Sequence, residues 1–98
     1  MADRIMMTPQ ELDDGASYLN QRRDAIASEV SALNARVQDI AGRWEGEAQR
    51  SFLERYTDLH KILSTELPEV IIAMETKLRE AARAIRETDQ AIAQAFRG

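Results

Sequence analysis

A chain of 98 residues has the length of one small domain, and its composition is typical of long helices. Aromatic residues make up only 5% of the chain, and the net charge of -4 comes from 13 basic and 17 acidic residues that are interleaved. This interleaving excludes the one-sided basic surface needed to bind nucleic acid, and the lack of cysteine excludes disulfides and thiolate metal ligands. We expect a single all-α domain over residues 1–98 that binds no nucleic acid.

Hydrophobic segments long enough for a membrane are missing from the sequence. Residues 1–7 lack the apolar run of a secretory signal peptide, and no later stretch approaches the ~20 apolar residues of a membrane span. The polar faces of the predicted helices are not basic, which argues against a helix lying on a membrane surface. We therefore expect no stable membrane insertion and, if the protein is exported, a route without a cleaved signal peptide.

The first predicted helix covers residues 9–41. Thr8 and Glu11 form a capping-box pattern around Pro9, which suits the first helical position. From there apolar residues alternate spacings of four and three, as in a heptad repeat, at Leu12, Ala16, Leu19, Ile26, Val30, Leu33, Val37, Ile40 and Trp44. Arg23 breaks the series, either as a side chain whose charged end reaches solvent or as a polar residue that sets register and partner choice.

A bend is predicted at residues 42–46. Gly42 and Gly46 tolerate the left-handed backbone that stops a helix, and the tripeptide Trp44-Glu45-Gly46 lies between the two helical patterns. Glu45 and Glu47 stand where the start of a following helix favours acidic residues. Because the link is short, the two helices must be antiparallel neighbours.

The second predicted helix covers residues 47–96. Phe52, Leu63, Met74, Ile85 and Phe96 recur every eleven residues, which is ~3.67 residues per turn and describes a nearly straight stripe. Pro68 removes one backbone hydrogen bond inside this pattern and crowds the carbonyl of Ser64. We expect a kink there in a continuing helix, with a true break into three helices as the alternative.

The predicted hairpin has more apolar surface than can be buried in its seam, the contact between its own two helices. Residues 70–74 are apolar all the way round the helix, which requires neighbours on more than one side. We expect a second hairpin to complete a four-helix bundle. The predicted partner interface consists of Leu19, Arg23, Ile26, Val30, Leu33, Val37, Leu63, Val70, Ile71, Met74 and Leu78.

No catalytic or metal-binding constellation is evident in the sequence. His60 is the only histidine and has no acid pair at ligand spacing around it, and adjacent acids such as Asp13-Asp14 have no accompanying nucleophile. No glycine-rich phosphate loop is present. We therefore expect a protein that is not an enzyme and binds no cofactor or metal.

Trp44-Glu45-Gly46, near mid-chain between two long helices in about one hundred residues, resembles the WXG family of small helical hairpins exported by type VII (ESX) secretion systems. The resemblance covers the whole chain and implies homodimers or heterodimers of hairpins, exported folded and recruited as a dimer by the type VII secretion ATPase. It also implies that Trp44 and Gly46 belong to a surface recognised in export. The alternative for Trp44 is that its ring only caps the apolar end of the bundle.

Many members of that family also carry a Tyr-x-x-x-Asp/Glu export signal late in the second helix. The nearest match here runs from Ile85 to Asp89, where the acid is present and the tyrosine is replaced. Tyr18 and Tyr56 do not supply the motif, since Arg22 and His60 follow them four residues later. The alternative for Asp89 is that it is an ordinary exposed acid in contact with solvent.

The resemblance therefore predicts the half of a heterodimer that lacks its own export signal and borrows it from a partner hairpin. The rival interpretation is a cytosolic coiled-coil adaptor or structural protein that never leaves the cell. Only Lys61 and Lys77 of the 13 basic residues are lysine, which is typical of a GC-rich genome such as that of an actinobacterium. We expect a protein that is cytoplasmic before export, then secreted, from an actinobacterium or another Gram-positive bacterium.

Overall fold

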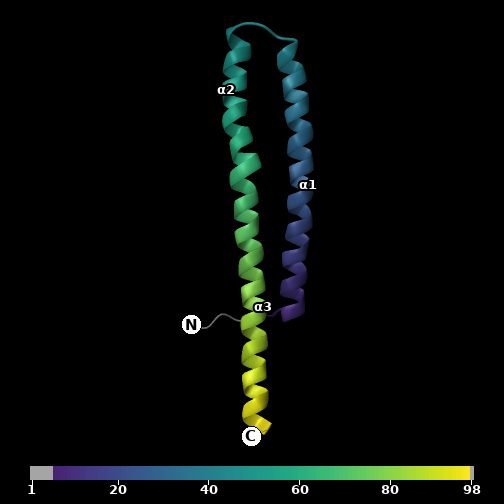
Figure 1. Cartoon of the computed structure of the whole chain (residues 1–98), viewed down its shortest axis with the longest axis vertical. Helices are drawn as coiled ribbons and strands as arrows, with labels where there is room; N and C mark the ends of the chain where they lie inside the picture. Colours follow the sequence, from purple (N-terminus) through teal and green to yellow (C-terminus); the bar gives the residue numbers. More distant parts are fainter. Residues whose placement is uncertain (1–5, 98) are drawn as a thin grey trace.

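The computed structural model describes residues 6–97 as a long hairpin measuring 77 × 25 × 17 Å. One arm is α1 (Pro9–Gly42), and the second arm consists of α2 (Glu47–Lys61), η1 (Ile62–Glu66) and α3 (Leu67–Arg97). The two arms run antiparallel and side by side (Figure 1). No strand occurs between residues 6 and 97, so the prediction of an all-α hairpin is confirmed.

α1 begins at the cap that the sequence indicates. The Thr8 hydroxyl accepts a hydrogen bond from the Glu11 backbone N–H at 3.1 Å, and Pro9 occupies the first turn. Both features satisfy or remove backbone donors that have no partner at a helix start. They fix the residue at which the first arm begins.

The bend between the arms is short and depends on one glycine. α1 ends at Gly42, and the N–H groups of Arg43 and Trp44 donate to the carbonyls of Ile40 and Ala41. Gly46 has φ of 120° and ψ of -176°, a backbone conformation that favours glycine, and α2 starts at the next residue. The reversal of the chain therefore takes place at residues 43–46.

The second arm stays helical through the region of Pro68. Instead of a break, the chain forms the π-helical turn η1, in which the Ser64 hydroxyl donates to the His60 carbonyl at 2.6 Å. Leu63, Leu67, Ile71 and Glu75 are part-buried or buried and lie four residues apart, whereas a heptad would alternate spacings of four and three. The wide turn accommodates the extra residue and keeps α2 and α3 against α1.

The core of the hairpin is thin and made of small side chains. The buried apolar residues are Leu12, Ala16, Val30, Val37, Ala41, Tyr56, Ile71 and Ala82, and no large side chain among residues 6–97 is fully enclosed. α3 also runs past the start of α1 (Figure 1), and residues 86–97 are all exposed. One hairpin therefore leaves much of its apolar surface in water.

Candidate partner interface

The seam between the arms contains a polar cluster near the middle of α1. Glu75 is only 8% exposed, and its carboxylate accepts hydrogen bonds from Asn20 Nδ2 and Arg23 Nε, both at 3.1 Å. Burial acts to raise the pKa of Glu75, but these two hydrogen bonds and the charges of Arg23 and Arg79 outweigh it. The pKa of Glu75 therefore lies below its ordinary value.

Further polar contacts continue along the same flank of the seam toward the start of α1. Asp13 accepts a hydrogen bond from Arg86 Nη1 at 2.6 Å and lies 3.7 Å from Arg79 Nη1. Arg79 also donates to the Ser17 hydroxyl at 3.3 Å. With Asn20, Arg23 and Glu75 these residues form the polar flank of the hairpin.

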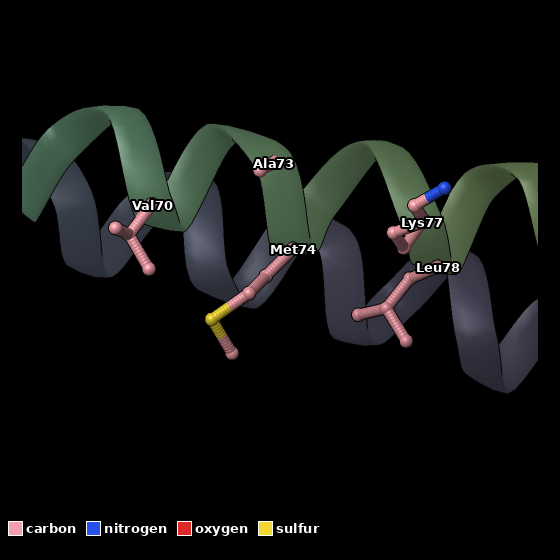
Figure 2. Close-up of a pocket in the computed structure, with 5 residues that line it drawn as sticks. All are labelled: Val70, Ala73, Met74, Lys77 and Leu78. Carbon is pink, nitrogen blue, oxygen red and sulfur yellow. The ribbon is translucent and has the colours of Figure 1, made fainter.

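The opposite flank of the seam is apolar. On this flank α1 and α3 approach each other closely at Gly15: a Cβ atom added there would lie 3.6 Å from Leu78 Cδ1. Ile26, Leu33 and Ile40 follow Gly15 by 11, 18 and 25 residues, which are whole numbers of helical turns, so they share its side of α1. Val70, Met74 and Leu78 point to one side of α3 (Figure 2).

These residues form one surface, which we call the outer face. Leu33, Ile40, Val70 and Met74 are exposed. Leu19, Ile26, Leu63 and Leu78 are half-buried at the edge between this surface and the seam. The outer face is defined by Leu19, Ile26, Leu33, Ile40, Leu63, Val70, Met74 and Leu78. It holds an open hollow of about 440 Å³ on α3, lined by Val70, Ala73, Met74, Lys77 and Leu78.

Four residues of the predicted partner interface lie instead in the seam of the chain itself. Val30, Val37 and Ile71 are 8%, 7% and 9% exposed, and Arg23 is bound to Glu75. They have little surface left for a partner. The spacing of apolar residues in α1 puts Val30 and Val37 in the same predicted stripe as Leu33 and Ile40. Only the contact with the second arm shows that the first two are buried in the seam and the other two lie on the outer face.

Trp44 lies at the bend beside Phe52, a contact that the sequence analysis did not predict. The rings of Trp44 and Phe52 are tilted at 42° with centroids 5.7 Å apart, and both are more than one-third exposed. Gln49 Nε2 donates to the Ala41 carbonyl at 2.9 Å and so caps the end of α1. A Cβ atom at Gly46 would have no neighbour within 4 Å, so the role of this glycine here is its positive φ.

Ile85 and Asp89, which the sequence analysis predicts to be a degenerate export motif, lie one turn apart on α3. Ile85 is half-buried and Asp89 is exposed. They line a second hollow of about 270 Å³ with Ala81, Ala84 and Thr88.

His60 lies in the seam, where its ring packs at 5.7 Å from that of Tyr56. The Tyr56 hydroxyl donates to Asn34 Oδ1 at 3.1 Å. Between residues 6 and 97, no group of three or more His, Cys, Asp or Glu side chains is placed to hold a metal ion. No helix in this range is long and apolar enough to cross a membrane.

Comparison with known proteins covers most of the chain. The family described as proteins of 100 residues with WXG matches residues 4–90. Protein YukE of Bacillus subtilis is 29% identical over 98 residues, which is all of both chains. Type VII secretion system extracellular protein A of Staphylococcus aureus is 27% identical over 94% of each chain. EsxA of Geobacillus thermodenitrificans superposes with a TM-score of 0.75 at 24% identity, covering 92% of this chain and 97% of that one.

The fold and the outer face define a small helical-hairpin protein with an unpartnered apolar surface. The chain belongs to the WXG100 family. It is therefore a small helical protein of a family associated with type VII secretion, and its relatives include extracellular proteins of Gram-positive bacteria.

Proposed function

We propose that this protein is a substrate of a type VII secretion system and acts without catalysis, as one half of a dimer of hairpins. The observation that carries the proposal is the outer face, an apolar surface contributed by both arms of a WXG100 hairpin. Exposed apolar surface of this extent marks an interaction site in a soluble protein. A second hairpin laid on it completes a four-helix bundle.

The partner in export is a related hairpin that carries the Tyr-x-x-x-Asp/Glu signal. This part of the proposal rests on Ile85, which stands where the family motif has tyrosine, and on the absence of a replacement at Tyr18 or Tyr56. The heterodimer then presents Trp44 and Gly46 of this chain beside the signal of its partner. The type VII secretion ATPase recruits the dimer through that combined surface.

The test is export of the tagged chain in its host, with and without the gene for the candidate partner. We expect the protein in the culture medium only when the partner is present, although its cellular level stays measurable without it. Export that continues after deletion of the partner gene contradicts the heterodimer. Retention in the cell with partner and secretion system intact supports a cytosolic adaptor instead.

The role of the bend is tested with Trp44→Ala and a matched aromatic control, Tyr18→Ala. Both side chains are exposed, and Tyr18 lies far from the bend on α1. We expect Trp44→Ala to reduce export while the complex with the partner still forms, and Tyr18→Ala to leave export unchanged. Equal export of the two variants contradicts a recognition role for Trp44.

A further inference from the structure

Trp44 stands on a part of the chain whose backbone does not restrict its side chain. It lies in the link at residues 43–46, between the end of α1 and the start of α2. Its backbone N–H donates to the Ala41 carbonyl at 3.3 Å, but the residue itself is not helical. Holding a side chain in one rotamer costs conformational entropy. A single orientation of the indole ring therefore needs a neighbour that packs against it.

Phe52 is such a neighbour. The centroids of the two rings are 5.7 Å apart, and the ring planes are tilted by 42°. Aromatic rings attract each other at separations of about 4.5 to 7 Å, and a tilt avoids the face-to-face stacking that their charge distributions disfavour. Among residues 6–97, no second aromatic ring is paired with that of Trp44. The contact with Phe52 is thus the aromatic contact that can hold the indole.

Phe52 lies between two contacts that fix α2 against α1. Three residues before it, Gln49 Nε2 donates to the Ala41 carbonyl at 2.9 Å. Four residues after it, the Tyr56 hydroxyl donates to Asn34 Oδ1 at 3.1 Å. Residues three and four apart lie on the same side of a helix, so both bonds tie to α1 the side of α2 that carries Phe52. The Phe52 ring therefore has a fixed place relative to the end of α1, where the link begins.

The ring of Phe52 contributes little to the core of the hairpin. Its side chain is 36% exposed, whereas Tyr56, one turn later on α2, is 7% exposed and supplies a buried aromatic ring. Phe52 contacts the link from the edge of the seam and does not fill its centre. Replacing its ring should therefore affect the bend more than the fold.

The contact with Phe52 leaves the polar edge of the indole without a partner. Trp44 Nε1 makes no hydrogen bond with any of residues 6–97. The indole N–H is a donor only, and such a group usually finds an acceptor when it is buried. A protein that covers the bend can therefore bind the exposed part of the ring and offer an acceptor oxygen to its N–H.

We propose that Phe52 is a positioning residue for Trp44. From α2 it holds the indole ring in one orientation at the bend, ready for the surface that binds the bend in export. The inference rests on the proposed function, because it gives Phe52 a role only if Trp44 is recognised. It extends the recognised bend to a residue outside Trp44-Glu45-Gly46.

Fluorescence of the purified full chain tests the positioning, because Trp44 is its only tryptophan. Time-resolved anisotropy separates fast motion of the indole from rotation of the whole hairpin. Phe52→Leu keeps an apolar side chain but removes the ring, and should lower the ratio of held to free indole orientations by about two- to tenfold. Phe52→Tyr keeps the ring and should leave this ratio within about twofold of the natural value.

Export of the same variants in the host tests whether the orientation is used. Phe52→Leu should reduce export by about two- to tenfold, in proportion to the loss of held indole, and Phe52→Tyr should restore it. The matched control is Tyr18→Leu, which removes an exposed ring of α1 far from the bend and should change neither the anisotropy nor export. Circular dichroism checks that the helices remain formed, and titration calorimetry checks that each variant still binds the export partner.

An indole as ordered in Phe52→Leu as in the natural chain overturns the inference. Normal export of Phe52→Leu with a loosened indole also overturns it, and so does loss of partner binding, which assigns Phe52 to the dimer contact instead. In each of these cases reduced export of Trp44→Ala leaves the recognition role of Trp44 standing. Normal export of Trp44→Ala removes that role, and the role of Phe52 with it, so this variant separates the two failures.

Discussion

The two flanks of the hairpin seam are formed by the same helices, but they differ in their contacts. The polar side chains of one flank are bound within the chain, whereas apolar side chains of the other remain exposed. On the polar flank, Glu75 and Asp13 are each bound by two residues of the other arm. On the apolar flank, Leu33 is 43% exposed although Val30, three residues earlier, is buried. The polar flank fixes how the arms of one chain meet, and we propose that the apolar flank binds another chain.

This difference shows how a small hairpin separates folding from pairing. Hydrogen bonds and ion pairs need defined geometry, so they suit the contact that must form in only one register within the chain. Apolar contacts are not directional and tolerate a choice of neighbour. The comparison predicts that substitutions on the seam change the stability of the hairpin, whereas substitutions on the outer face change association.

The largest effect is expected from overfilling the seam. Ala16 is fully buried, so Ala16→Leu adds atoms where no space exists and should lower the free energy of unfolding by about 2 to 3 kcal/mol. Urea denaturation followed by circular dichroism measures the loss. Ala35→Leu, at an exposed position of the same helix, is the matched control and should change stability by less than about 0.5 kcal/mol. Equal losses at the two sites contradict the assignment of the seam.

A charge on the outer face is expected to act on association. Leu33→Asp places a carboxylate in the proposed contact with the export partner and should weaken the heterodimer by about 2 kcal/mol, roughly 30-fold in Kd. Titration calorimetry with the purified partner gives the constant. Ala35→Asp carries the same charge on the side of α1 away from the seam and should bind as the natural chain does. Unchanged affinity of Leu33→Asp removes this residue from the interface.

The bend end of the seam offers a smaller test. Gln49→Ala removes the side-chain donor to the Ala41 carbonyl and should cost about 1 kcal/mol of stability. Gln38→Ala, at an exposed glutamine of α1, controls for the loss of a polar side chain and should be nearly neutral. Thermal unfolding compares them, and a neutral Gln49→Ala shows that solvent satisfies this carbonyl equally well.

Glu75→Gln leaves the polar flank one acceptor oxygen where the carboxylate offers two, to Asn20 and to Arg23, and removes the charge that pairs with Arg23. Its signature is in the pH dependence. Since the pKa of Glu75 is lowered in the fold, its carboxylate stabilises the hairpin above the ordinary value of 4.5, and this contribution is lost as the pH falls through the folded pKa. The melting temperature of the natural chain should therefore fall more steeply below pH 4.5 than that of the variant. Parallel curves contradict the proposed role of Glu75.

Sequence reasoning recovered the helical arms and the bend because these depend on local chemistry. Thr8, Pro9 and Gly46 act through their own backbone or hydroxyl groups, and the structure shows each in such a role. The π-helical turn before Pro68 was not predicted. It depends on keeping Leu67 and Ile71 against α1, which no local rule contains.

The partner interface stays a prediction, and the structure shows only which of its residues are still exposed in one hairpin. Leu33, Val70 and Met74 are exposed and remain available to a partner, whereas Val30, Val37 and Ile71 are used within the chain. A heptad repeat identifies which residues are apolar on one side of a helix, but not which of two neighbours covers them. The polar seam residues Asn20 and Asn34 were missed for the same reason, since a count of apolar spacing ignores them.

The sequence by itself determined an all-helical chain, its reversal at Trp44-Glu45-Gly46 and its family, because caps, glycine conformations and a short motif act over a few residues. Only the tertiary structure decided which apolar residues close the hairpin and which remain on the outer face. That division depends on how α1 and the second arm are rotated about their own axes. The contacts of Glu75 and Asp13 on one flank and of Gly15 with Leu78 on the other set this rotation.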